Sequence, residues 1–215
     1  MLITKYFSEK LGIEVIPEVN DWSKKWHCYD SGGVECEVGE LLYSLARVIK
    51  PQNVLETGLY SAVSTMYICQ ALKDNGFGHL QSFEIEEEHI KRSTERLKKL
   101  DLFDWVTIHH QSSLDYTPDR QFEIFCLDSE PWLRFHELAR FFPNLKEGGF
   151  ALIHDLHHHC GQVVVEGKEF AWPWGKLPDK LKKLVQDKRL TPVYFPSPRG
   201  LTMFYRPTKD DYKWI

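Results

Sequence analysis

The chain has 215 residues, of which 42% are hydrophobic, so it can bury a full core and most simply forms one domain. A net charge of −4 and a sequence pI near 6.2 argue against a general nucleic-acid-binding surface. No apolar run reaches the roughly 18 residues of a membrane span, and the N-terminal apolar segment is too short for a secretory signal. Five scattered cysteines without a Cys-x-x-Cys motif indicate reduced thiols and a cytoplasmic protein.

The N-terminal part of the chain differs from the rest. Residues 1–33 are rich in aromatic side chains and end in Ser31-Gly32-Gly33, so we expect an arm or lid with room for one short helix. Residues 34–215 are expected to form the globular domain. From Glu37 to Ile49 apolar residues recur at the spacing of an amphipathic helix. Lys50-Pro51 ends this helix, because proline disfavours helix at the residue before it.

Strands and helices then alternate along the chain. The predicted strands are residues 54–56, 80–85, 106–109, 124–127 and 150–154, and the predicted helices are residues 61–73, 87–100, 131–142 and 178–188. Lys146-Glu-Gly-Gly149 is expected to turn into strand 150–154. Residues 193–195 and 201–205 flank the turn Pro196-Ser-Pro-Arg-Gly200, which predicts a closing hairpin. This alternation indicates an α/β fold, a Rossmann-like doubly wound sheet that is mostly parallel with a C-terminal antiparallel hairpin strand.

The segment Asn53–Thr65 is the most informative, because an apolar strand runs through Glu56 into a turn glycine and a small-residue helix start. Backbone N–H groups at a helix N-terminus beside a fixed negative charge suit a ligand with a carboxylate and a cationic group, such as S-adenosylmethionine (SAM). The dinucleotide fingerprint G-x-G-x-x-G fails, because positions 60 and 63 are Tyr and Val.

The next predicted strand ends at Glu84, where an acidic side chain can bind both ribose hydroxyls. Taken alone, Glu84 could equally be an ordinary solvated acid. Its place beside Glu56 at the adjoining strand end favours the ribose interpretation.

Over about residues 34–206 the chain resembles the class I SAM-dependent O-methyltransferases. Glu56-Thr-Gly-Leu-Tyr-Ser-Ala-Val-Ser64 is similar to the catechol-type pattern acid-x-Gly-x-Tyr-x-Gly-x-Ser, with Ala62 at the second glycine. The segments that resemble the following strands are 82–85, 106–113, 127–128 and 148–155. The resemblance implies that Glu56 lies near the cofactor amino group, Tyr60 and Ser64 on its methionyl part, and Ser112 or Ser113 near adenine. The cofactor-binding positions that it implies are Val34, Glu56, Gly58, Tyr60, Ser61, Ser64, Glu84, Ile85, Ser112, Ser113 and Asp128.

Catechol-type relatives imply Mg²⁺ held by carboxylates after the fourth and fifth strands, where Asp128 and Asp155 stand in this chain. The third ligand is replaced by Leu156 and the lysine base by Pro131, so that mechanism is not fully encoded.

The run His154-Asp-Leu-His-His-His-Cys160 leaves three interpretations open. A histidine, His154 or His157, acts as general base oriented by Asp155. Alternatively Asp128, Asp155 and His157 hold a divalent metal, with Mn, Fe or Zn favoured over Mg. In the third interpretation these are surface histidines without chemistry. His109 and His110 are expected to be strand-end residues rather than ligands.

We therefore expect a methyltransferase that moves a methyl group from SAM to a hydroxyl of a small-molecule acceptor, such as a metabolite, a sugar or a natural-product intermediate. Trp172 and Trp174 could stack on a flat acceptor or pack against the N-terminal arm. The turn Arg199-Gly200 resembles one used at subunit contacts or at a site rim, so a homodimer is considered. We expect no nucleic-acid or membrane partner.

Two other classes of function stay open at this point. One is a nicotinamide-dependent oxidoreductase or a metal-dependent, hydroxylase-like enzyme on a Rossmann-like fold. The missing fingerprint glycines and the closing hairpin count against the oxidoreductase. The other is a non-catalytic binding protein that kept the fold.

Overall fold

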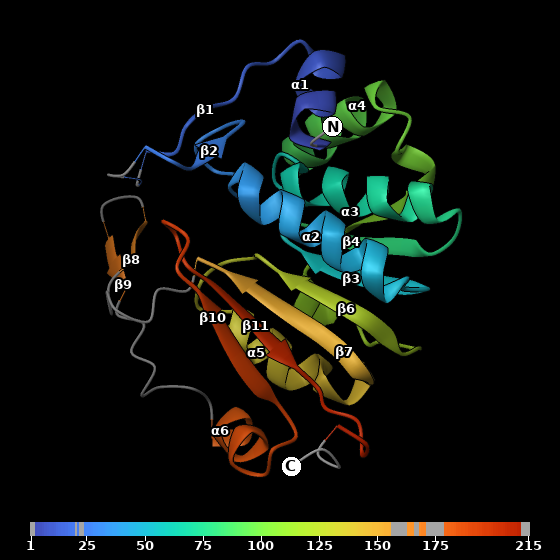
Figure 1. The fold of residues 1–215 in the computed structure, drawn as a ribbon, viewed down its shortest axis with the longest axis vertical. Coiled ribbons are helices and arrows are strands. Elements are labelled where there is room, and N and C mark those ends of the chain that lie inside the picture. The colour runs from blue at the N-terminus through green and yellow to red at the C-terminus, as the bar shows by residue number, and fades with distance from the viewer. Residues whose placement is uncertain are drawn as a thin grey trace. The chain divides into compact units, whose positions relative to one another are not determined.

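The computed structural model describes residues 3–19, 21, 24–155, 163–165, 168–170 and 179–211 (Figure 1). The chain divides into two compact units, Met1–Thr117 and Pro118–Ile215. The main sheet is mostly parallel and has seven strands, three from the first unit and four from the second. Within the described residues, no helix is both long enough and apolar enough to cross a membrane.

The first unit combines a short N-terminal hairpin with alternating helices and parallel strands. Its described elements are α1 (Ile3–Leu11), β1 (Ile16–Pro17), β2 (His27–Cys28), α2 (Cys36–Ile49), β3 (Asn53–Thr57), α3 (Val63–Asn75), β4 (His79–Glu84), α4 (Glu87–Lys99), η1 (Phe103–Trp105), β5 (Val106–His110) and η2 (Ser113–Asp115). The sheet order within this unit is β3-β4-β5, and both pairs are parallel.

The helices of the first unit follow the burial pattern of their sequences. In α2 the side chains of Val38, Leu42 and Ala46 are buried on one face, as an amphipathic helix requires. In α3 every residue from Val63 to Leu72 is buried, and a helix that is buried all round belongs to the interior of its unit. α2 packs along α3, and α3 also contacts β4 (Figure 1).

The N-terminal helix α1 is held to α2 and α3 by a polar network. The backbone N–H and the hydroxyl of Thr4 both donate to Glu40, at 2.8 and 2.7 Å. The Thr4 hydroxyl also lies 2.7 Å from that of Tyr67, and Tyr29 donates to the Thr4 carbonyl. The ring of Phe7 meets that of Tyr67 edge-on at 5.1 Å. These contacts anchor the start of the chain, while its role as an arm or lid stays a prediction.

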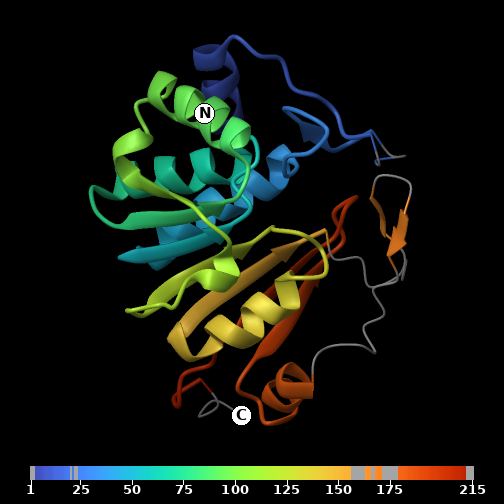
Figure 2. The same cartoon turned by 180° about the vertical axis from the view of Figure 1, so that it is seen from behind.

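The second unit contains the other four strands of the main sheet. Its described elements are β6 (Phe122–Leu127), α5 (Arg134–Phe141), η3 (Phe142–Asn144), β7 (Leu145–His154), β8 (Val163–Val165), β9 (Lys168–Phe170), α6 (Asp179–Gln186), β10 (Thr191–Phe195) and β11 (Leu201–Tyr205). The order is β10-β11-β7-β6; β6 and β7 are parallel, and β11 is antiparallel to both of its neighbours. Figure 2 shows α5 lying against β6 and β7. The predicted fold class is confirmed, including the closing hairpin.

Three predicted boundaries are wrong, each for a local reason. Lys146–Gly149 is not a separate turn, because β7 already begins at Leu145; the register to β6 shifts there, and Gly148 adopts φ +80°. This segment is a bulge, for which the same glycines are suited. Helix α5 begins three residues later than predicted, after a turn at residues 131–133. Helix α3 begins at Val63, because Ala62 before it has left-handed φ +59°.

The packing of α2 on α3 yields a testable prediction. A Cβ atom on Gly39 would lie 2.2 Å from the ring of Tyr67, which is buried. Alanine favours helix over glycine by about 1 kcal/mol, but overpacking a core costs about 1–3 kcal/mol. A contact of 2.2 Å calls for the upper part of that cost, about 2–3 kcal/mol. We therefore expect Gly39→Ala to lower the free energy of unfolding by about 1–2 kcal/mol in urea titrations, after the helix gain of about 1 kcal/mol is subtracted.

Val48→Ala is the matched control, since Val48 lies on the same helix with 80% of its surface exposed. It should change the free energy of unfolding by no more than about 0.5 kcal/mol. A Gly39→Ala protein as stable as the wild type would show that this contact does not limit how closely the two helices approach.

Candidate functional site

The register of the first unit brings the predicted cofactor residues to one edge of its strands. Thr57 pairs with Phe83, and Glu84 pairs with His110, so β3, β4 and β5 end at the same level. In open α/β sheets ligands bind outside the carboxyl ends of the strands. The loop that follows β3 and the residues that follow β4 lie at this edge.

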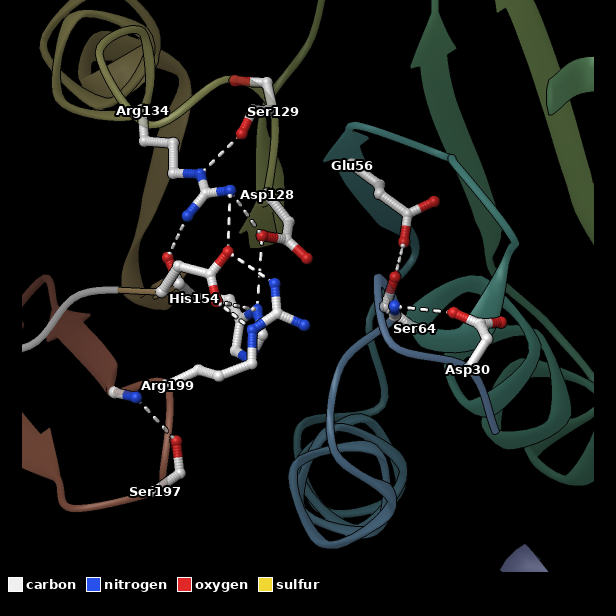
Figure 3. Close-up of polar contacts among 12 residues, drawn as sticks. Asp30, Glu56, Ser64, Asp128, Ser129, Arg134, His154, Ser197 and Arg199 are labelled. Carbon is white, nitrogen blue, oxygen red and sulfur yellow. Dashed lines mark hydrogen bonds and ion pairs between the residues drawn. The ribbon is translucent and has the colours of Figure 1, made fainter. Parts of the chain in front are cut away.

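Glu56 is fully buried near the end of β3 (Figure 3). Ser64 donates to one of its carboxylate oxygens at 2.7 Å. Thr65 and Ser82 donate to the other oxygen at 2.7 and 2.6 Å. These three hydroxyl groups come from α3 and β4, so the carboxylate joins β3 to both elements. Hydroxyl donors satisfy a carboxylate without cancelling its charge.

Glu84 organises the backbone around the strand ends. One of its oxygens accepts from the Tyr60 N–H at 2.9 Å, and the other accepts from the Ile85 and Glu86 N–H groups at 2.8 and 3.0 Å. The Nδ1 atom of His89 lies 3.5 Å from the first oxygen. The carboxylate therefore holds the loop after β3 against the end of β4.

The loop between β3 and α3 is built from left-handed backbone. Gly58, Tyr60 and Ala62 have φ values of +83°, +42° and +59°. This conformation is easy for glycine and strained for other residues, and such strain clusters at ligand-binding turns. The Tyr60 ring is 37% exposed and stands edge-on to the ring of His89. Arg96 of α4 fixes the end of this loop, because its guanidinium group donates to the Ser61 carbonyl at 2.6 Å.

The remaining predicted cofactor residues of the first unit differ in exposure. Val34, Ser61 and Ser113 are buried, whereas the side chain of Ile85 is exposed. The hydroxyl of Ser61 is buried without a hydrogen-bond partner among the described residues. Ser112 caps η2 by accepting from the Leu114 N–H at 3.2 Å. His109 and His110 both lie within β5, and the ring of His109 stacks on Phe83 at 4.6 Å.

In the second unit, a compact charged cluster forms where β6 and β7 end (Figure 3). Leu127 pairs with Ile153, so Asp128 follows β6 at the level where His154 ends β7. The Nδ1 atom of His154 lies 3.3 Å from Asp128 and 3.4 Å from Asp155. His154 is only 2% exposed, and Asp155 has left-handed φ +55°. The predicted Asp128, His154 and Asp155 are thus brought together.

Arg134, at the start of α5, ties this cluster together and is 5% exposed. Its Nε donates to the Ser129 carbonyl at 2.7 Å and its Nη1 to the His154 carbonyl at 2.5 Å. Its Nη2 lies 3.0 Å from Asp128 and 3.3 Å from Asp155. One guanidinium group therefore connects the ends of both parallel strands.

Arg199 reaches Asp155 from the turn between β10 and β11. Its Nε lies 2.6 Å from one carboxylate oxygen, and its Nη2 donates to the other at 2.8 Å. This is the paired geometry of a strong arginine–carboxylate contact. Burial alone would raise the pKa of Asp155, but His154, Arg134 and Arg199 together lower it below its usual range.

Asp128, His154 and Asp155 form the group among the described residues that could in principle hold a metal, with ligand atoms within 4.8 Å of one another. The surroundings do not fit a divalent ion, because both carboxylates already face guanidinium groups. A metal site of this kind needs carboxylate oxygens directed at the ion. His157, the predicted third ligand and alternative base, lies outside the described residues, as do Trp172 and Trp174.

Sequence reasoning missed Arg134, and it placed Arg199 only in a turn at a subunit contact or a site rim. A signal was present for the first: a cation in the first turn of a helix is unfavourable for the helix dipole, so an arginine there calls for a buried acidic partner. Arg199 can be located at the site only once the register of the hairpin is known. Leu201 pairs with His154, which places the turn before β11 at the carboxyl end of β7.

The chain is similar to known methyltransferases. Residues 55–156 match the family model described as "Methyltransferase domain". A protein of Mycolicibacterium vanbaalenii named "Putative O-methyltransferase" is 23% identical over 177 residues, which cover 80% of this chain and 76% of that protein.

Solved structures share the fold. The SAH-bound methyltransferase PaMTH1 from Podospora anserina superposes with a TM-score of 0.67 at 18% identity, over 96% of this chain and 94% of that one. The O-methyltransferase TomG from Streptomyces achromogenes, solved with SAM, gives 0.64 at 17% identity over 83% of each chain. These matches do not favour the alternatives of a nicotinamide-dependent oxidoreductase or a hydroxylase-like enzyme.

Arg134 gives a testable prediction about stability. Removing one partner of a buried ion pair leaves an uncompensated buried charge, which costs about 3–5 kcal/mol. We expect Arg134→Ala to lower the free energy of unfolding by about this amount in urea titrations, because Asp128 loses its guanidinium partner and two carbonyls lose their donor.

Arg120→Ala is the control, because Arg120 pairs with Asp119 where both side chains are largely exposed. Exposed pairs contribute about 0–1 kcal/mol. Similar losses in the two variants would contradict the role assigned to Arg134.

Proposed function

We propose that this chain belongs to the class I SAM-dependent O-methyltransferases and transfers a methyl group from SAM to a hydroxyl oxygen of a small-molecule acceptor. The observation that carries the proposal is that the segment matching the methyltransferase family model also contains the loop after β3 and the Glu84 carboxylate at one strand edge. A metabolite, a sugar or a natural-product intermediate would be a suitable acceptor. The names of the O-methyltransferase relatives support oxygen as the atom that is methylated.

The residues of the first unit fit SAM in charge and in hydrogen-bonding capacity. The buried Glu56 carboxylate lies beside the loop and accepts hydrogen bonds from uncharged hydroxyl groups, which suits a ligand with a cationic amino group. The buried Ser61 hydroxyl lacks a partner among the described residues, and such groups usually find one in a ligand or a water. Glu84 would bind the ribose hydroxyls, Tyr60 and Ser64 the methionyl part, and Ser112 or Ser113 the adenine. Val34, Gly58 and Ile85 complete the predicted binding set in this unit.

SAM, when bound, supplies an activated methyl group to an oxygen nucleophile placed behind it. The protein must hold that nucleophile in line, and positioning can contribute several kcal/mol to lowering the barrier. It must also accept the proton that the hydroxyl loses.

We assign this proton to His154 in the second unit. Against the effect of burial, the guanidinium groups of Arg134 and Arg199 lower the pKa of Asp155 and make that carboxylate a weak base. Histidine has an ordinary pKa suited to general-base work, and Asp128 and Asp155 both lie close to the Nδ1 of His154. The two carboxylates then orient the imidazole and favour its protonated form after the transfer. Asp128 is also one of the predicted cofactor-binding residues.

Ligand binding provides the first test of the function. In calorimetric titrations of the purified chain, SAM and its demethylated product S-adenosylhomocysteine are expected to bind, and NAD is not. Glu84→Ala should weaken binding of both ligands at least about tenfold, as the loss of a charge-assisted hydrogen bond would.

Glu86→Ala serves as the control, because Glu86 lies two residues further along with an exposed side chain, and only its backbone N–H contacts Glu84. Binding of NAD alone would overturn the proposal. Screening phenols, sugars and amines as acceptors, with the demethylated product as readout, then identifies the acceptor class.

His154 can be tested separately from cofactor binding. We expect His154→Asn to lower kcat by about 10²- to 10⁴-fold, because a general base contributes by that factor, with the SAM affinity unchanged. His79→Asn is the control, since His79 lies at the opposite end of β4 from Glu84 and bonds Thr107. A His154→Asn enzyme with nearly full kcat would place the base elsewhere.

A further inference from the structure

The carboxylates that follow β6 and β7 stand where catechol-type relatives imply a metal, but guanidinium groups surround them. Asp128 lies 3.0 Å from Arg134, and Asp155 lies against both Arg134 and Arg199. Both oxygens of Asp155 contact the Arg199 guanidinium. Two negative charges thus meet two positive charges within one buried cluster.

We infer that Arg134 and Arg199 take the place of a divalent cation at Asp128 and Asp155, so that this site works without a bound metal. The inference deepens the proposed function, on which it rests for the role of the site. It replaces the predicted metal ligand set with an ion-pair cluster whose members all belong to the second unit.

Charge and geometry both support the inference. A divalent ion bound to either carboxylate would lie close to a guanidinium group. Because both carry positive charge, they would repel each other strongly in a buried site. Asp155 Oδ2 accepts hydrogen bonds from both arginines. The Oδ1 atoms of Asp128 and Asp155 accept none among the described residues, but they lie 3.0 and 2.6 Å from guanidinium nitrogens. Pairing the acids with arginine compensates their negative charge at fixed positions.

The two arginines differ in how firmly they are held. Arg134 cannot move without releasing the carbonyls of Ser129 and His154, so it is a permanent part of the cluster. Arg199 lies in the turn between β10 and β11, outside any helix or strand, and is the arginine whose replacement should disturb the fold least.

Manganese binding tests the inference directly. Mn²⁺ is titrated into the full chain, and the free ion is followed by electron paramagnetic resonance. Wild type and Arg199→Lys should show no saturable site, because each keeps a cation beside Asp155. Arg199→Gln removes the guanidinium group that faces Asp155 Oδ1, while Arg134 stays at Oδ2, and it should bind Mn²⁺ at least about tenfold more tightly than wild type. The added Asp155→Asn substitution should abolish the gain.

Arg120→Gln is the matched control, since it breaks an arginine–aspartate pair at an exposed position, and it should gain no Mn²⁺ site. A saturable wild-type site that Asp155→Asn removes would overturn the inference. A folded Arg199→Gln protein without any gain would overturn the role of Arg199. If Arg199→Gln does not fold, the inference is tested by comparing the Mn²⁺ binding of wild type with that of Asp155→Asn. Calorimetry with S-adenosylhomocysteine on the same samples reports the proposed function independently.

Discussion

Parallel strand pairing in fixed register is the constraint on which both groups of site residues depend. Because parallel strands end at the same edge, the pairing of Glu84 with His110 brings the residues after β3, β4 and β5 to one level. The same rule places Asp128 beside His154 in the second unit. The antiparallel strand β11 extends this logic, because its first residue pairs with His154 and its preceding turn must then lie at the same end. The strand register thus positions the site residues, and their side-chain contacts depend on it.

The two units treat their buried carboxylates in opposite ways. Glu56 is satisfied by three hydroxyl groups, which donate hydrogen bonds and leave its negative charge in place. Asp155 is satisfied by Arg134 and Arg199, which cancel its charge as well. The first arrangement suits the cationic group of a bound cofactor. The second fixes an acidic residue beside His154 and lowers its basicity, which is why the proposed mechanism assigns the proton to the imidazole.

Backbone strain occurs next to the site residues of both units. Tyr60 and Ala62 in the loop after β3, and Asp155 after β7, have positive φ without being glycine. Strained conformations of this kind persist only where the surrounding contacts hold them. The Glu84 carboxylate, which binds the Tyr60 N–H, supplies such a contact in the first unit, and the arginine pair supplies it in the second.

The sequence by itself determined the alternation of strands and helices, the class of the sheet and the cofactor loop. These depend on local signals, namely apolar periodicity and turn residues, whose effect reaches only a few positions along the chain. It also placed Asp128 and Asp155 after two strands, with His154 or His157 as the accompanying histidine, because strand ends can be located from the same signals. Only the tertiary structure decided what surrounds that group. Arg134 comes from a helix start and Arg199 from a distant hairpin turn, and their meeting at Asp155 depends on strand register, which local patterns do not encode.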